Sequence, residues 1–149
     1  MDNIIIIPNI HEFTQKIING DLVLTRIIPI IDEHALFQKN LRGSTIINCK
    51  INNTNMDIHK YKTLLIYIYS ITNKEIIIKN TVLNIIQEEK YDKGYYYYAN
   101  LSFSVQGADT RRTLQEIINI IKKINCKMEL KIKLKNGEII IFILEHYEN

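Results

Sequence analysis

The chain has 149 residues, a length that suits one domain with a buried core of its own. Its formal net charge of +3 excludes the strongly cationic balance of a dedicated nucleic-acid coat protein, and its 46% hydrophobic and 23% charged residues exclude a disordered or collagen-like chain. Every apolar run is much shorter than the ~18 residues that span a membrane, and no signal-peptide pattern is present. We therefore expect no membrane association and a cytoplasmic protein, or one of the host cytoplasm if the source is viral.

Amino-acid usage points to the source rather than to an activity. Isoleucine, Asn, Lys and Tyr are frequent and Trp is absent. Because these four residue types have codons rich in A and T, we interpret the bias as that of an AT-rich bacterial, phage or viral genome. Cys49 and Cys126 lie far apart and in no CxxC pattern, so we expect both to be reduced. We expect no cofactor.

Residues 1–42 predict an αβ extension. It begins with a short strand over 4–7, and Asn9 then caps a helix that ends at Gly20. A strand over 21–31, interrupted by Pro29, and a helical turn over 34–40 complete it. Because no linker rich in Pro, Gly or Ser follows, we expect residues 1–149 to form a single domain, with this extension packed on a core over 43–149.

The core begins with a strand over 44–52, where apolar and polar side chains alternate. A helix follows over 58–72, where apolar residues recur at steps of three and four residues. Residues 75–87 are rich in β-branched side chains, but their pattern drifts around Lys79. They predict either one bulged strand or two short ones.

The second half of the core repeats this order more regularly. Its predicted elements are a strand over 94–105, a helix over 110–124 capped by Asp109 or Thr110, and two strands over 127–135 and 138–145 joined by Asn136-Gly137. Strand, helix, strand, followed by strand, helix, strand, is the order of the split βαβ or ferredoxin-like sandwich. We therefore predict an α+β fold with a ferredoxin-like βαββαβ core, an added C-terminal hairpin strand and the N-terminal extension.

The C-terminal hairpin can be analysed further, because a two-residue turn at Asn136-Gly137 would fix its register. Leu134 would then face Ile139 on the core side. The other face would carry an apolar row beside charged residues, formed by Ile140, Phe142 and Leu144. A sheet face in solvent does not usually carry such a row, so we expect a cover. The N-terminal extension is the preferred cover, and a second copy in a homodimer or a partner protein are the alternatives.

Two arginines, Arg111 and Arg112, lie in the first turn of the predicted helix over 110–124. Cations at this end oppose the helix dipole, at a cost of a few tenths to ~1 kcal/mol, which suggests that they serve a partner. Arginine can fork onto a phosphate or a carboxylate, so an acidic protein surface fits as well as a phosphate. A solvated helix start is the simpler interpretation.

Four tyrosines follow Lys93-Gly94, and this run resembles the start of the RNP1 signature of RNA-recognition motifs, which opens with a basic residue, Gly and an aromatic residue. The resemblance ends at Tyr96, where that signature has Gly or Ala. It implies stacking of bases on Tyr96 and Tyr98, with Lys50 or Lys93 near phosphates. The preferred interpretation is that the tyrosines pack as ordinary strand residues.

The leading prediction is a small non-catalytic protein, such as an immunity protein, antitoxin or inhibitor, that binds another protein. Its predicted contact residues are Arg111, Arg112, Ile140, Phe142 and Leu144. The alternative is an RNA- or single-stranded-DNA-binding domain that uses Lys50, Lys93, Tyr96 and Tyr98. A third, weaker alternative is a small enzyme whose site the fold assembles from scattered His, Asp and Arg residues. The 4 histidines lack metal-ligand spacing, so we expect no metal site.

Overall fold

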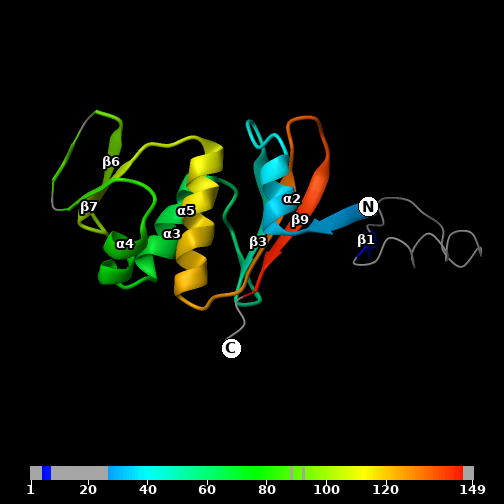
Figure 1. Cartoon of the computed structure of the whole chain (residues 1–149), viewed down its shortest axis with the longest axis horizontal. Helices are drawn as coiled ribbons and strands as arrows, with labels where there is room; N and C mark the ends of the chain where they lie inside the picture. The colour runs from blue at the N-terminus through cyan, green and yellow to red at the C-terminus, as the bar shows by residue number, and fades with distance from the viewer. Residues whose placement is uncertain (1–4, 8–26, 88, 92, 146–149) are drawn as a thin grey trace, which may run out of the picture.

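Figure 1 shows a computed structural model of the chain, which describes residues 5–7, 27–87, 89–91 and 93–145. Within these residues the fold is mixed α+β, with four helices and two sheets, so the predicted α+β class is confirmed. Across the same residues, no helix combines the length and the apolar character that crossing a membrane requires.

The two sheets lie on opposite sides of a layer of helices (Figure 1). The larger sheet has six strands in the order β1-β2-β9-β8-β3-β4, and the smaller has three in the order β5-β7-β6. The strands are β1 Ile5–Ile7, β2 Ile27–Ile31, β3 Thr45–Ile51, β4 Thr54–Met56, β5 Ile85–Gln87, β6 Tyr95–Tyr98, β7 Phe103–Gln106, β8 Met128–Lys133 and β9 Ile139–Leu144. The helices are α2 Glu33–Gln38, α3 Tyr61–Ser70, α4 Lys74–Asn80 and α5 Thr110–Lys123.

Helix α5 lies at the centre of the core. Asp109 caps its first turn, as predicted, and Leu114, Ile117 and Ile121 on its apolar stripe are all 0% exposed. One contiguous cluster of buried side chains joins this stripe to Phe103 of the smaller sheet and Phe142 of the larger one. Full burial of a side chain of this kind contributes on the order of 1.5–3 kcal/mol. Both sheets therefore depend on the helix layer for their burial.

The strands are distributed differently from the predicted ferredoxin-like core. That core requires strands of both halves in a single sheet. In the structure, β3 pairs with β8 in the larger sheet, whereas β5, β6 and β7 form the smaller sheet by themselves. Two local differences, at residues 75–87 and 94–105, account for this division.

Residues 75–87, predicted as strand, fold first as a helix. Asn73 caps α4 by accepting the Glu75 amide at 2.8 Å, and Lys79 lies in its last turn. An acid in the first turn and a base in the last both match the helix dipole. β5 begins only at Ile85. Capping and end charges therefore outweigh the β-branched composition of this segment.

Residues 94–105, predicted as one strand, form a hairpin. The chain turns at 99–102, where Ser102 has a φ of 56°, and it returns as β7. Tyr96 lies opposite Val105 and Tyr98 opposite Phe103. Because cross-strand neighbours share a face, both tyrosines lie on the side of the buried Val105 and Phe103. The alternation of a single strand over 94–105 would place Tyr96 and Tyr98 on the face opposite Phe103 and Val105, so this part of the prediction is wrong.

The C-terminal hairpin forms as predicted, but its register differs by one residue. The Leu134 amide donates to the Glu138 carbonyl at 2.7 Å, and the Gly137 amide donates to the Leu134 carbonyl at 2.9 Å. The loop is therefore 135–137, one residue longer than predicted, with Gly137 at a φ of 93°. Leu130 consequently lies opposite Phe142.

This slip exchanges the two faces of β9. Ile140 and Phe142 are 0% exposed in the core, and Leu144 packs against them, so the prediction that these three residues form an outer row is wrong. The residues that lie beside the charged side chains of β8 are instead Ile139, Ile141 and Ile143. Because β9 is apolar at every position, an apolar row does occupy the second face, but it is the other row.

The described part of the N-terminal extension is built into the larger sheet. β2 runs parallel to β9, with Ile30 opposite Ile141, and β1 runs parallel to β2. The predicted helical turn over 34–40 is α2, which Asp32 caps and which buries Leu36 completely. The predicted helix over 9–20 lies outside the described residues.

Candidate arginine pocket

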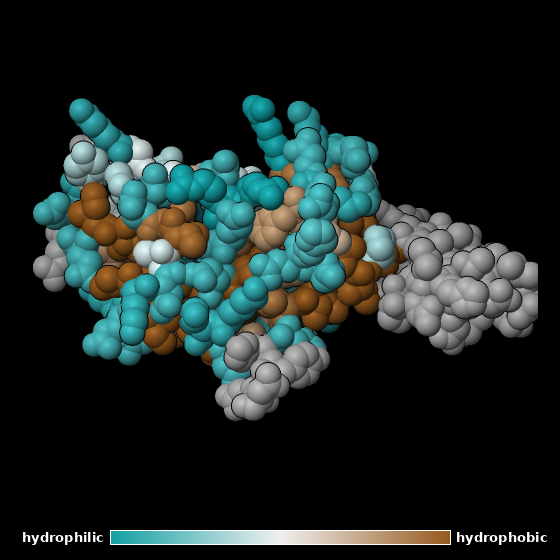
Figure 2. Space-filling view, in the orientation of Figure 1, coloured by the Kyte–Doolittle hydropathy of each residue, from teal (hydrophilic) through white to brown (hydrophobic). Residues whose placement is uncertain are grey.

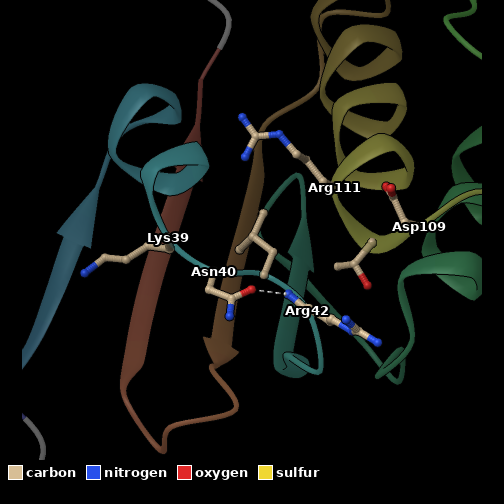
Figure 3. Close-up of a pocket in the computed structure, with 7 residues that line it drawn as sticks. Lys39, Asn40, Arg42, Asp109 and Arg111 are labelled. Carbon is tan, nitrogen blue, oxygen red and sulfur yellow. Dashed lines mark hydrogen bonds between the residues drawn. The ribbon is translucent and has the colours of Figure 1, made fainter.

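A pocket of about 550 Å³ opens between the loop that joins α2 to β3 and the first turn of α5 (Figure 3). Most of its lining residues are polar, and three of them are cations. The full lining consists of Lys39, Asn40, Leu41, Arg42, Asp109, Thr110 and Arg111. We call this site the arginine pocket. It contains one of the two arginines that the sequence predicted as partner-binding.

Arg111 is held at the α2 end of the arginine pocket. One Nη atom of its guanidinium donates to the Phe37 carbonyl at 2.9 Å, and the guanidinium carbon lies 5.2 Å from the centre of the Phe37 ring. The hydrogen bond and the cation–π contact orient this side chain, which extends from α5 toward α2 in Figure 3. The guanidinium has more N–H donors than these contacts use, so it can still bind an anion.

Arg42 supplies a cation from the opposite wall. The Asn40 side-chain oxygen accepts the Arg42 amide at 3.2 Å and stabilises the loop, and the Arg42 side chain extends toward the first turn of α5 (Figure 3). Among the described residues, no carboxylate lies within ion-pair distance of Arg42. Lys39 differs, because its ammonium lies 2.8 Å from Glu138.

Asp109 is the acidic member of the pocket lining, and it already has a structural role. Its carboxylate accepts the Arg112 amide at 2.8 Å as the N-cap of α5. Thr110 and Arg111 come before Arg112 in the helix, and their amides have no acceptor within it. The first turn therefore adds positive potential to the pocket. The arrangement favours an anionic ligand.

Arg112, predicted together with Arg111, does not line the arginine pocket. It is exposed, and its guanidinium has no hydrogen bond or ion pair within the described part of the chain. The two neighbouring arginines therefore have different surroundings. The structure brings Arg111 together with Arg42, which the sequence did not identify.

Ile140, Phe142 and Leu144 do not join Arg111 in a common surface. Ile140 and Phe142 are fully buried on the face of β9 that meets the helix layer. The predicted protein-binding face therefore loses its apolar part, since it depended on the wrong hairpin register.

The residues of the nucleic-acid alternative are divided between the two sheets. Lys50 lies on β3 of the larger sheet, 3.6 Å from Glu129. Tyr96 and Tyr98 lie on β6 of the smaller sheet, and Lys93 is exposed just before that strand. Lys93 is therefore close to the two tyrosines in the sequence, whereas Lys50 lies in the other sheet.

The tyrosines of β6 have partners of their own. Tyr96 is 51% exposed, and the Lys62 ammonium lies 3.3 Å from the centre of its ring. On the other face, the Lys90 ammonium lies 5.5 Å from the Tyr97 ring, and Tyr91 meets Tyr95 edge to face at 5.2 Å. These contacts fix the rings as parts of the sheet.

Glu116 is a charged residue buried away from the arginine pocket. It is 0% exposed and accepts the Tyr69 hydroxyl at 2.7 Å, the Thr81 hydroxyl at 2.6 Å and the Val82 amide at 2.5 Å. Burial and the adjacent carboxylate raise the pKa of Tyr69 far above its ordinary value, so this hydroxyl remains a donor. The network holds the α4–β5 connection against α5.

Other titratable groups are scattered. Within the described ranges, no three His, Cys, Asp or Glu side chains group so that they could hold a metal ion, and Cys49 and Cys126 are not joined. Exposed apolar side chains occur on α4 and at its flanks, namely Ile71, Ile78 and Val82. Figure 2 shows apolar surface on the side of the molecule that carries α4 and the smaller sheet. These three side chains line no pocket with the arginines.

The sequence did carry a weak signal for Arg42. Lys39 to Gly43 is a short basic loop that ends in a glycine, and Gly43 has a φ of 75°. Nothing local connects this loop to Arg111, because their proximity depends on the packing of α2 beside α5. Comparisons with protein-family models, with curated proteins and with solved structures find no match.

Proposed function

We propose that this protein is non-catalytic and acts by binding another protein, as immunity proteins, antitoxins and inhibitors do. We also propose that it is encoded by an AT-rich bacterial, phage or viral genome. Its partner presents an acidic surface, and the arginine pocket is the contact site. One observation carries the proposal: Arg42 and Arg111 line the same pocket, and neither has a carboxylate partner among the described residues.

Physical chemistry supports a protein partner. Arginine is enriched at protein interfaces and at their hot spots, because its planar guanidinium binds carboxylates in a fixed geometry. The net charge of +3 provides little of the general electrostatic attraction on which nucleic-acid binding depends. Binding of RNA or single-stranded DNA through Lys93, Tyr96 and Tyr98 stays a prediction.

Affinity capture with paired charge reversals tests the proposal. The tagged protein should retain a protein from a nuclease-treated lysate of the source cells, with 1:1 stoichiometry in the purified complex. Reversal of both pocket arginines, Arg42→Glu with Arg111→Glu, should abolish capture, because unlike charges across an interface become like charges.

Arg112→Glu is the matched control, since it makes the same change one residue outside the pocket. This variant should still capture the partner. Equal capture by the double reversal and the unmodified protein would contradict the proposal. So would a bound fraction that disappears on nuclease treatment, which would instead support nucleic-acid binding.

A further inference from the structure

The arginine pocket adjoins two neighbouring hollows, with each of which it shares lining residues. It shares Arg111 with a hollow of about 450 Å³ that extends along α2 past Phe37 and His34. It shares Lys39 and Asn40 with a hollow of about 200 Å³ that reaches the C-terminal hairpin at Lys135. The three hollows therefore follow one another from α2, across the α2–β3 loop, to the hairpin turn. We call this series of hollows the loop groove.

The cations and acids of the loop groove differ in how they are neutralised. Each lining acid is engaged: Glu33 lies 2.5 Å from Lys122, Glu138 lies 2.8 Å from Lys39, and Asp109 caps α5. Three lining cations have no carboxylate within ion-pair distance in the described ranges: Arg42, Arg111 and Lys135. Asp109 is hydrogen-bonded but has no ion pair among the described residues, so three cations stand against one carboxylate and the unpaired charge along the groove is positive.

Gly43 allows Lys135 to approach the loop. A Cβ atom at Gly43 would lie 3.2 Å from Cδ of Lys135, closer than ordinary van der Waals contact. The positive φ of 75° at Gly43 also disfavours any residue with a side chain. The Lys135 stem consequently lies against the loop that carries Arg42.

We propose that the loop groove binds an extended acidic segment of the partner protein, an inference that rests on the proposed function. The cations are spaced along the groove, and Arg111 and Arg42 extend in different directions from opposite walls of the arginine pocket (Figure 3). Because Arg111 and Arg42 point in different directions and Lys135 lines the neighbouring hollow, several carboxylates along an extended chain suit these cations better than a single carboxylate does. Charge complementarity selects the segment.

A peptide fits the loop groove better than a nucleic-acid strand. Glu33 and Glu138, each paired with a lysine, and Asp109 interrupt the row of unpaired cations, so a strand with a negative charge at every nucleotide would place some of its phosphates beside carboxylates. A peptide can place neutral residues beside these acids and acidic residues beside the cations. The same groove therefore discriminates between the two classes of polyanion.

Fluorescence anisotropy at low ionic strength tests the inference with defined probes. These are a labelled peptide of alternating Glu and Gly, the corresponding Lys and Gly peptide, and an oligothymidylate of the same length. The acidic peptide should bind saturably and more tightly than either other probe. Arg42→Ala, Arg111→Ala and Lys135→Ala should each weaken its binding by about two- to fivefold, the range expected for exposed charge pairs. Arg112→Ala should leave its affinity unchanged.

Three results would overturn the inference: no saturable binding of the acidic peptide, tighter binding of oligothymidylate, or an equal loss in Arg112→Ala and Arg111→Ala. Thermal unfolding of each variant checks that it is folded. The inference and the proposed function fail separately. If the unmodified protein binds the acidic peptide but captures no partner, the proposed function is wrong and the groove still binds acidic peptides. If it captures a partner but does not bind the acidic peptide, only the inference of an acidic segment is wrong.

Discussion

His59 has an acceptor for both of its ring nitrogens. Nδ1 lies 3.0 Å from the Ile46 carbonyl, and Nε2 lies 3.0 Å from the Asp57 carboxylate. A neutral imidazole has a single N–H and can serve only one acceptor, whereas the protonated ring serves both. The Ile46 carbonyl, followed by Asp57, therefore raises the pKa of His59 above its ordinary 6.5.

A pH dependence of stability follows from this shift. Because the pKa of His59 is higher in the folded state, its stabilising contribution is fully present below the unfolded value of 6.5 and is lost as the pH rises through the folded value. The difference in urea midpoint between the unmodified protein and His59→Gln should therefore be largest in acid and should shrink above neutrality. An NMR titration of the ring should give a midpoint above 6.5. A midpoint at or below 6.5 would contradict the assignment.

At the residue scale, the sequence predicted that Arg111 lies in the first turn of a helix, and the structure confirms this position. A cation in a first helical turn opposes the dipole, and Arg111 does lie in the first turn of α5. Neither the different surroundings of Arg111 and Arg112 nor the proximity of Arg42 to Arg111 could be derived from the sequence. Both depend on which way a side chain points around the helix and on the tertiary packing of α2.

At the element scale, the C-terminal hairpin offers a direct test of register. Phe142 is fully buried and Ile143 is half-buried, whereas a two-residue turn would exchange their faces. Phe142→Ser should reduce the free energy of unfolding by about 3–5 kcal/mol, by analogy with loss of a buried Phe. Ile143→Ser should reduce the free energy of unfolding clearly less than Phe142→Ser does. Urea unfolding measures both, and the opposite order of the two costs would disprove the observed register.

Elements with strong capping and strict periodicity were predictable, and the others were not. α5 has Asp109 as its N-cap and a continuous apolar stripe, so both its position and its buried face follow from the sequence. At residues 75–87, β-branched composition and helix capping oppose each other, and capping prevails. In the tyrosine segment, alternation continues through the turn at 99–102, so periodicity alone cannot show that the strand ends at Tyr98.

At the scale of the whole molecule, the two sheets share one apolar core, so they should unfold together. The described tyrosines lie in α3, in the smaller sheet or in the segment before it, and most report on that side: Tyr61, Tyr67, Tyr69, Tyr91 and Tyr95 to Tyr98. Tyr61 is the exception, because its hydroxyl lies 2.8 Å from that of Ser44, directly before β3. Cys49 of β3 reports on the larger sheet. It is 0% exposed, and burial raises the pKa of its thiol to about 11, so it reacts slowly while folded.

Urea unfolding of a Cys126→Ser protein should therefore give coincident midpoints by tyrosine fluorescence and by Cys49 labelling. Ile117→Ala in α5 should lower both midpoints equally, with a loss of about 2–5 kcal/mol, because the cavity lies in the shared layer. The unmodified Ile117 protein in the same background is the control. Labelling of Cys49 before the tyrosine signal changes would show that the sheets unfold independently.

The global topology was the least predictable level. The order of strands and helices restricts the fold to mixed α+β, but it does not determine which strands pair. Pairing of β3 with β8, and separation of the β5–β7 sheet from both, depend on contacts between distant segments. A helix in place of a strand at Lys74–Asn80 and a turn at 99–102 accompany this arrangement.

The uniform apolar character of β9 has a consequence for the folding landscape. Most strands are protected from slippage because the wrong register places polar residues in the core. β9 lacks this protection, since either register would bury isoleucines. The energy gap between the native hairpin and its slipped competitor must therefore come from turn geometry at Gly137 and from the shape of the Phe142 site. The register of this hairpin therefore depends on a glycine in the loop and on one buried aromatic ring.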